Sequence, residues 1–202
     1  MLEYENELYK EGMNLIAGVD EVGRGCLFGD VVACAIIMPK NLIIEGVKDS
    51  KKVSKKKREY LYDIILDKAL AIGIGQVDSK TIDKINIKES TKIAMKKAVL
   101  SLKDKDGHTV LPEYILIDAE ELDLSLPQKS IIKGDEISHT ISCASIVAKV
   151  YRDRLCLEWD KQYPGYNVKK HKGYGTKEHR ESILSLGPTP IHRMTFLRNI
   201  IK

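Results

Sequence analysis

The stretch Ala17-Gly-Val-Asp-Glu-Val-Gly-Arg-Gly25 is the part of this sequence from which the fold is best predicted. Its apolar residues predict a short buried strand that ends at Asp20 and Glu21. Adjacent carboxylates are costly when buried unpaired and useful when they bind a cation. Gly23 and Gly25 flank the arginine, so the chain can turn sharply and another molecule can approach its N–H groups. The stretch indicates a metal ion beside a phosphate, although ordinary surface turns use the same residue types.

Two later apolar stretches, Tyr114–Asp118 and Ser130–Asp135, also end in an acid. Strand ends of this kind converge at one edge of an open sheet, where ligand sites form. Two divalent ions about 4 Å apart neutralise a phosphodiester, activate water and stabilise the leaving oxygen. Magnesium and manganese accept oxygen ligands without His or Cys. A helix cap, a turn or a salt bridge is the alternative role for each acid in the predicted set of Asp20, Glu21, Asp118 and Asp135.

The remaining apolar patterns predict alternating helices and strands, and hence an α/β domain. A strand over 31–38, buried on both faces, is expected to pair with the first strand. A helix over 138–159 carries small residues that would let it pack closely on the sheet. The other expected elements are helices over 3–12, after Ser54, within 78–86, over 89–102 and near 177–186, and a strand over 69–77.

Composition limits the class of protein. The chain has 202 residues, enough for one compact domain. Its 33 Lys+Arg against 29 Asp+Glu make it mildly basic, which is compatible with a polyanionic partner. Four widely spaced cysteines are expected to be reduced core residues, and the charged start lacks an apolar leader segment. We therefore expect a soluble cytoplasmic protein.

Two basic stretches are candidates for phosphate contacts. Seven of the eleven residues 48–58 are Lys or Arg. The lysines that follow Ser54 are unfavourable with the dipole of the helix expected to start there. They either bind phosphates or form an ordinary solvated helix start. Residues 169–176 place Tyr174 between glycines, where it either meets substrate or packs under a surface loop. The candidate lysines are Lys51, Lys52, Lys55, Lys169, Lys170 and Lys172. We expect Arg152 and Asp153 to form an ion pair, and His171 and His192 to be packed or surface side chains rather than general acids.

The motifs occur in the order found in the type 2 ribonucleases H, and the chain resembles ribonuclease HII of the bacterial kind over most of its length. The matching segments are AGVDEVGRG at 17–25, KDSKK at 48–52, LID at 116–118, KGD at 133–135, ISCASIVAKVYRD at 141–153, HKGYGT at 171–176 and HR at 192–193.

The resemblance implies a fold, an activity and site residues. The fold is an RNase H-like mixed five-stranded sheet flanked by helices, with residues from about 160–202 as a small helical extension of one catalytic domain that contributes to substrate binding. The activity is Mg²⁺- or Mn²⁺-dependent cleavage of RNA in RNA–DNA hybrids, including incision 5′ to a single ribonucleotide in duplex DNA, with 3′-hydroxyl and 5′-phosphate ends. The implied metal ligands are Asp20, Glu21, Asp118 and Asp135. The implied substrate-binding residues are Gly23, Arg24, Gly25 and Tyr174, and Lys51 and Lys172 are added as phosphate contacts.

This sequence departs from the family pattern in two places. Cys26 stands where the family usually has proline, and Ala119 where it commonly has glycine. Glu120, Glu121 and Asp123 follow Asp118 and bring extra acids whose effect on metal preference is open.

Three other functions remain open at this point. Ribonuclease HIII shares the acids, but its extra N-terminal domain has no room here. A non-catalytic hybrid-binding module would keep its affinity when an acid is replaced, and a phosphohydrolase acting on a small metabolite would lack the steep salt dependence of duplex binding. We expect a monomer, and the sequence does not indicate whether a replication clamp binds it.

Overall fold

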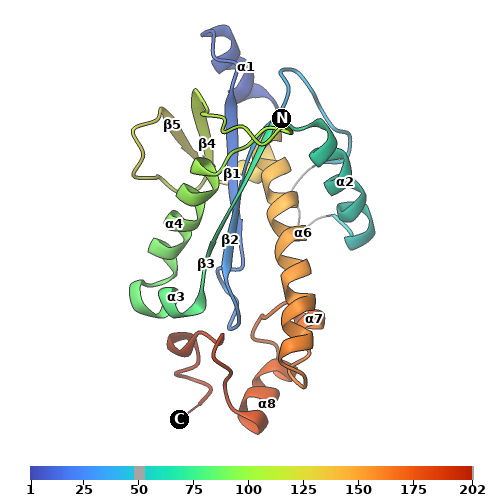
Figure 1. Cartoon of the computed structure of the whole chain (residues 1–202), viewed down its shortest axis with the longest axis vertical. Helices are drawn as coiled ribbons and strands as arrows, with labels where there is room; N and C mark the ends of the chain where they lie inside the picture. The colour runs from blue at the N-terminus through green and yellow to red at the C-terminus, as the bar shows by residue number, and fades with distance from the viewer. Residues whose placement is uncertain (48–52, 202) are drawn as a thin grey trace.

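The computed structural model describes residues 1–47 and 53–201. Its centre is a mixed five-stranded sheet with the order β3-β2-β1-β4-β5 (Figure 1). The strands are β1 (Ile16–Val22), β2 (Val31–Ile37), β3 (Ala71–Val77), β4 (Tyr114–Asp118) and β5 (Gln128–Ile131). β1 pairs with β2 and β2 with β3 antiparallel, whereas β4 runs parallel to both β1 and β5. The predicted mixed sheet and the pairing of the first two strands are confirmed.

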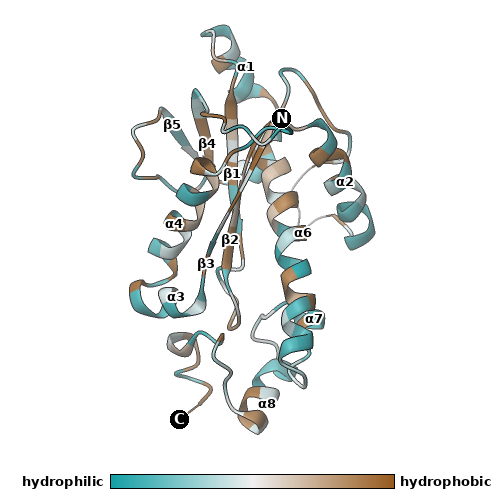
Figure 2. Cartoon of the chain, in the orientation of Figure 1, coloured by the Kyte–Doolittle hydropathy of each residue, from teal (hydrophilic) through white to brown (hydrophobic). Residues whose placement is uncertain are grey.

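Helices cover both faces of the sheet. The helices of the described residues are α1 (Glu3–Lys10), α2 (Lys55–Lys68), α3 (Ser79–Ile85), α4 (Ile87–Leu100), α5 (Gly134–Ile137), α6 (His139–Gln162), α7 (Val168–His171) and α8 (Lys177–Leu186), with the 3-10 turn η2 (Met194–Phe196). Figure 1 shows α4 on one side of the sheet and α6 with α2 on the other. The strands are mostly brown in Figure 2 and the outer helix α2 mostly teal, as expected for a sheet buried between amphipathic layers.

Alternate residues of the strands enter two separate cores. Ala17 and Val19 face α4 in one core, and Cys34 and Ile36 face α2 and α6 in the other. α6 lies directly against β1: a Cβ on Gly18 would be 2.4 Å from the carbonyl carbon of Thr140. This contact holds the start of α6 close to the strand that carries Asp20 and Glu21.

One predicted strand is wrong in its bounds. The extended segment is Gln128–Ile131 rather than 130–135, because Lys133 adopts a left-handed conformation with φ 57°. Asp135 consequently lies on the short helix α5 and not at the end of a strand.

The C-terminal elements pack around Phe28, in the loop that follows the Gly-Arg-Gly turn. Phe28 is fully buried with Tyr166, Val168, Ile183 and Leu197. The loop after β1 is therefore enclosed by residues from the last part of the chain. All four cysteines are buried and free, as predicted. Among residues 1–47 and 53–201, no helix is long and apolar enough to cross a membrane.

Candidate active site

Three of the four predicted acids meet at the edge formed by β1 and β4. Asp20 and Glu21 lie near the end of β1, and Asp118 is the last residue of the parallel strand β4. Each side chain offers an oxygen, and these three oxygens all lie within 4.8 Å of one another. The parallel pairing of β1 and β4 thus brings acids that are almost a hundred residues apart in the sequence into one cluster.

The fourth acid is adjacent to this cluster through α5. The N–H of Gly134 donates a 2.7 Å hydrogen bond to Asp118 Oδ1. Asp135 is the next residue and is buried, with a relative exposure of 8%. Its carbonyl accepts a 2.6 Å hydrogen bond from Ser142 Oγ, which fixes α5 against α6.

The environment of Asp20 disfavours its ionised form. Its side chain is buried, and burial raises its pKa well above the ordinary range. The negative charges of Glu21 and Asp118 raise the pKa further, while hydrogen bonds from Ser145 and from the Glu21 N–H, at 2.7 Å, lower it. The cluster therefore concentrates more negative charge than its own hydrogen bonds compensate, which a bound cation would relieve.

A cleft of about 150 Å³ opens over the acids. It is lined by Asp20, Glu21, Val22, Gly23, Arg24, Gly25, Ser145, Lys149 and Tyr174. The cleft thus brings two predicted metal ligands, the whole predicted Gly-Arg-Gly element and the predicted tyrosine to one place.

Arg24 lies between two acids at the rim. Its Nη1 is 3.0 Å from Glu120 Oε1 and 3.8 Å from Glu21 Oε1. Glu120, one of the extra acids after Asp118, is thus paired with the arginine. The other two, Glu121 and Asp123, are exposed, and Asp123 contacts Lys96 at 3.4 Å.

Tyr174 is held beside the Gly-Arg-Gly turn by main-chain pairing. Cys26 and Tyr174 form an antiparallel bridge, and the Leu27 N–H donates a 2.8 Å hydrogen bond to the Gly173 carbonyl. The thiol of Cys26 donates to the Lys172 carbonyl at 3.4 Å. Desolvation raises the pKa of the Tyr174 hydroxyl, so it stays protonated at neutral pH. Cys26 therefore joins the turn to the tyrosine loop.

The predicted lysines have different environments. Lys51 and Lys52 lie outside the described residues, and Lys55 and Lys169 are exposed. The ammonium of Lys172 donates to the Lys169 carbonyl, and partial burial lowers its pKa. Lys149, which was not among the predicted residues, lines the cleft and is paired with Asp153. Lys149 follows Ser145 by four residues, so both lie on the same face of α6, and this spacing could have indicated that Lys149 is near the cleft.

The predicted Arg152–Asp153 ion pair is wrong. Arg152 donates to main-chain carbonyls, and Asp153 is bound by Lys149 and lies 3.7 Å from Arg58. Adjacent helix residues point about 100° apart, so the two side chains reach different neighbours.

His171 and His192 are packed histidines, as predicted. Together with His179 they form a buried group in which His179 Nε2 lies 3.3 Å from His192 Nε2. His192 Nδ1 accepts from the Thr189 N–H at 2.8 Å, and His179 Nδ1 is 2.9 Å from the Tyr174 carbonyl. Each imidazole therefore has one tautomer that satisfies all its contacts, and burial lowers the pKa of His179 and of His192 to about 4.

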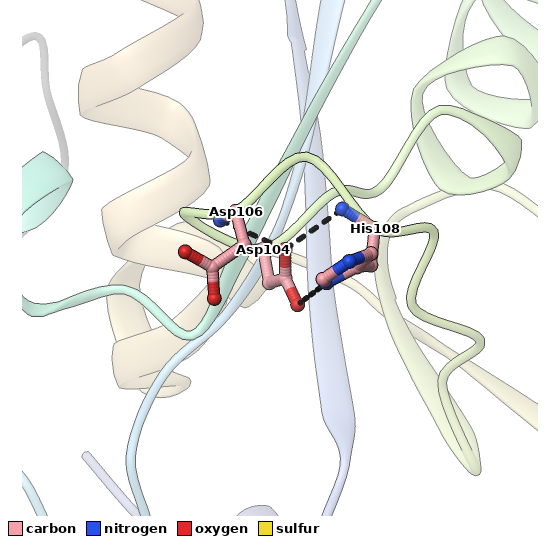
Figure 3. Close-up of side chains that lie close together, drawn as sticks. All are labelled: Asp104, Asp106 and His108. Carbon is pink, nitrogen blue, oxygen red and sulfur yellow. Dashed lines mark hydrogen bonds and ion pairs between the residues drawn. The ribbon is translucent and has the colours of Figure 1, made fainter.

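A second group of metal-ligand side chains is a polar turn. Figure 3 shows Asp104, Asp106 and His108 on the loop after α4. Asp104 Oδ1 accepts from the N–H groups of Asp106 and His108, at 3.0 and 2.8 Å, and its Oδ2 is 3.3 Å from the His108 ring. These contacts are those of an Asx turn, so the three side chains are already used in holding a surface loop.

A mixed sheet with carboxylates at the ends of two neighbouring parallel strands, below a cleft, is the arrangement that the resemblance to the ribonucleases H implies. The comparisons with known proteins agree: the family model for Ribonuclease HII matches residues 17–199. The chain is 60% identical over 200 residues to a Ribonuclease HII of Alkaliphilus oremlandii, covering 99% of this chain and 98% of the relative. It is 57% identical over 201 residues to a Ribonuclease HII of Alkaliphilus metalliredigens, covering 100% and 98%.

A solved structure extends the likeness to three dimensions. The ribonuclease H2 of Pyrococcus horikoshii OT3 is similar with a TM-score of 0.75 and 26% identity, over 92% of this chain and 96% of that one. The chain belongs to the ribonuclease HII family. It is accordingly an endonucleolytic ribonuclease H, a hydrolase that degrades RNA in RNA–DNA hybrids.

Proposed function

We propose that this ribonuclease also incises duplex DNA on the 5′ side of a single embedded ribonucleotide, using two divalent ions, Mg²⁺ or Mn²⁺, held by Asp20, Glu21, Asp118 and Asp135. The products carry 3′-hydroxyl and 5′-phosphate ends, so the reaction serves removal of misincorporated ribonucleotides and of RNA primers. The observation that carries the proposal is the convergence of three carboxylate oxygens within 4.8 Å beneath a cleft bordered by Gly23, Gly25 and Tyr174.

The donor set fits hard divalent cations. All four residues offer carboxylate oxygens, the ligands that Mg²⁺ and Mn²⁺ prefer, and Asp20 is held in a buried position where its negative charge is unfavourable without a cation. Such ions, when bound, supply charge neutralisation on the phosphate and an activated water. Glu120 does not join this set, because Arg24 is within 3.0 Å of it.

Recognition of the ribonucleotide is assigned to the Gly-Arg-Gly turn and to Tyr174, which both line the cleft. A 2′-hydroxyl both donates and accepts hydrogen bonds, so a turn with accessible main-chain groups can distinguish it from deoxyribose. Gly23, Arg24 and Gly25 form such a turn. Tyr174, which is 41% exposed and lies beside the turn, offers a ring for stacking and a protonated hydroxyl. Together they would favour a junction between one ribonucleotide and the next deoxyribonucleotide.

The duplex would be positioned by contacts to its phosphates. Lys172, and Lys51 outside the described residues, are the proposed phosphate-binding lysines, and Lys149 is added because it lines the cleft. The segment from about 160 to 202 contributes to substrate binding by carrying Tyr174 and Lys172 within one catalytic domain. We propose that the enzyme acts as a monomer.

The test is cleavage of a labelled DNA duplex with one ribonucleotide, in Mg²⁺, in Mn²⁺ and in EDTA, beside an all-DNA duplex and a continuous hybrid. We expect one metal-dependent cut, 5′ to the ribonucleotide, and an intact all-DNA duplex. Asp118→Asn should abolish the cut while duplex binding persists, and Asp123→Asn, an exposed acid on the same loop, should cleave like the wild type. Cleavage of the hybrid alone would remove the ribonucleotide-reading role from Tyr174 and from the glycine turn.

A further inference from the structure

Arg152 and Arg193 are two buried guanidinium groups that bind main chain. Their relative exposures are 1% and 0%, and both donate to carbonyl oxygens. Asp30 is an acid whose pKa both arginines lower, against the larger effect of burial that raises it to about 6. Burying a cation costs several kcal/mol unless strong contacts compensate it. Both cations bind carbonyls of the loop that contains Phe28. We therefore infer that they hold this loop in its position.

Arg152 joins the two segments that border the cleft. From α6, its Nε donates to the Asp30 carbonyl at 2.9 Å and its Nη2 to the Phe28 carbonyl at 2.9 Å. Its Nη1 donates to the carbonyl of Lys172, two residues before Tyr174, at 2.8 Å. One rigid planar group thus links the loop after the Gly-Arg-Gly turn to the tyrosine loop.

Arg152 also lies directly behind the turn. A Cβ on Gly23 would be 2.3 Å from Arg152 Nε, and Gly23 has φ +92°. The turn therefore rests against the guanidinium with no space for a side chain between them. A displacement of Arg152 would move the turn itself.

Arg193 holds the same loop from the C-terminal side. Its Nη1 donates to the Arg24 carbonyl at 2.8 Å and its Nε to the Gly29 carbonyl at 2.9 Å, so it spans both ends of the loop. Its own N–H donates to the Leu27 carbonyl at 2.9 Å. The position of Arg24, and with it the open face of the turn, is thus set by a residue 169 positions away in the sequence.

We propose that Arg152 and Arg193 are positioning residues that fix the separation between the Gly-Arg-Gly turn and Tyr174, and thereby set the preference for a single ribonucleotide over a continuous hybrid. The proposal rests on the function proposed above. Two groups that read one ribonucleotide must keep their spacing, since a misplacement of about 1 Å can cost about 100-fold in rate. A continuous hybrid presents a 2′-hydroxyl at every step of one strand and tolerates such a shift better.

The experiment uses lysine variants, which keep the charge but lose the fork of donors. Arg152→Lys is matched by Arg154→Lys, a half-exposed arginine two residues further along α6, and Arg193→Lys by Arg198→Lys, an exposed arginine of the same terminal segment. The kcat and KM of each protein are measured on the single-ribonucleotide duplex and on the hybrid, with the melting temperature. Fluorescence of Trp159, the only tryptophan, reports the loop, because its ring lies 6.2 Å from that of Phe28 and 5.6 Å from the Arg152 guanidinium.

We expect kcat/KM on the single-ribonucleotide duplex to fall about 10- to 100-fold in the two test variants, with a changed Trp159 spectrum. On the hybrid it should fall no more than about threefold, and both control variants should match the wild type. Parallel losses on both substrates that follow the melting temperature would show a purely structural role and overturn the proposal, as would an unchanged preference.

A measurement on the wild-type protein keeps the proposal testable if a lysine variant does not fold. The N–H groups of Leu27 and Tyr174, which bind the carbonyls of Gly173 and His171, should exchange with solvent only through global unfolding. Fast exchange at either site would contradict a fixed separation. If the wild type cleaves hybrid but not the single-ribonucleotide duplex, the proposed function fails, and the exchange rates and the Trp159 spectra still decide whether the arginines fix the loop.

Discussion

Replacing Asp20 by Asn should make the metal-free protein more stable while abolishing cleavage. The two side chains are nearly isosteric, and the amide oxygen can still accept the 2.7 Å hydrogen bond from the Glu21 N–H. What disappears is a buried charge beside two others. At an effective dielectric constant of about 20, two unit charges 4.8 Å apart, the largest separation in the cluster, repel by about 3.5 kcal/mol. Part of this cost is avoided because Asp20 can bind a proton instead. We expect a gain of about 1–3 kcal/mol in the free energy of unfolding at pH 7.5.

The stability difference between the wild type and Asp20→Asn should depend on pH. The folded pKa of Asp20 is raised above its unfolded value of about 3.9, so the folded state retains a proton that the unfolded state has lost. Its stabilising contribution is complete below the unfolded pKa and is lost as the pH rises. The advantage of Asp20→Asn over the wild type should therefore grow from pH 5 to pH 8.

Urea denaturation with and without Mg²⁺ is the assay. A metal that binds the folded wild type at 100 times its Kd adds about 2.7 kcal/mol, and the variant should gain much less, so that the order of stability reverses when metal is added. Asp123→Asn, which removes an exposed acid, should show neither effect. A metal-free Asp20→Asn protein less stable than the wild type would refute the electrostatic reasoning.

Three further predictions concern the cleft and its support. Gly25→Ala should change the free energy of unfolding by less than about 0.5 kcal/mol, because the nearest contact of the new methyl is a Tyr174 carbon at 3.9 Å. Cleavage should nevertheless drop, because the methyl enters the cleft. Urea melts test the first effect and cleavage rates the second. Gly23→Ala should destabilise the fold by about 2–4 kcal/mol in the same melts, since its φ is +92° and the methyl would lie 2.3 Å from Arg152 Nε; equal effects of the two substitutions would contradict the geometry. His179 and His192 have folded pKa values of about 4, below the unfolded value, so protonation favours the unfolded state. Each histidine should therefore lower the free energy of unfolding by up to about 3 kcal/mol as the pH falls from 6.5 to 4. A His192→Gln variant whose stability has the wild-type pH dependence would contradict this prediction.

The parts of the site that could be predicted from sequence are those set by local pattern. An apolar run ending in acids shows where a strand ends, and parallel strands bring such ends together, so the meeting of Asp20, Glu21 and Asp118 followed from periodicity and chain order. The placement of Asp135 did not follow. A left-handed Lys133 ends the extended segment early, and lysine carries no signal for that conformation, which glycine or asparagine would have given.

The support of the cleft could not be predicted, because its acceptors are main-chain carbonyls. Arg152 and Asp153 have the residue types of an ion pair, and side-chain type alone favours that interpretation. The carbonyls of Phe28 and Lys172 have no residue-type signature, and they become acceptors only after the C-terminal segment has packed on the loop that follows β1. A contact of this kind is a property of the tertiary structure.

The loop after Asp118 shows how this chain departs from the common pattern of its family. Ala119, where glycine is common, has φ 52°, a left-handed conformation that costs a non-glycine residue about 1–2 kcal/mol. The next residue, Glu120, reaches Arg24 at 3.0 Å, but Arg24 is 37% exposed, so the pair contributes at most about 1 kcal/mol and does not clearly offset that cost. The main effect of the Glu120–Arg24 pair is therefore on the position of the arginine side chain and not on stability. Arg24 neutralises the charge of Glu120, and this pairing draws the guanidinium to the β4 side of the cleft. The flanking main-chain groups of the turn, rather than the arginine head, are then left for the proposed contact with the sugar.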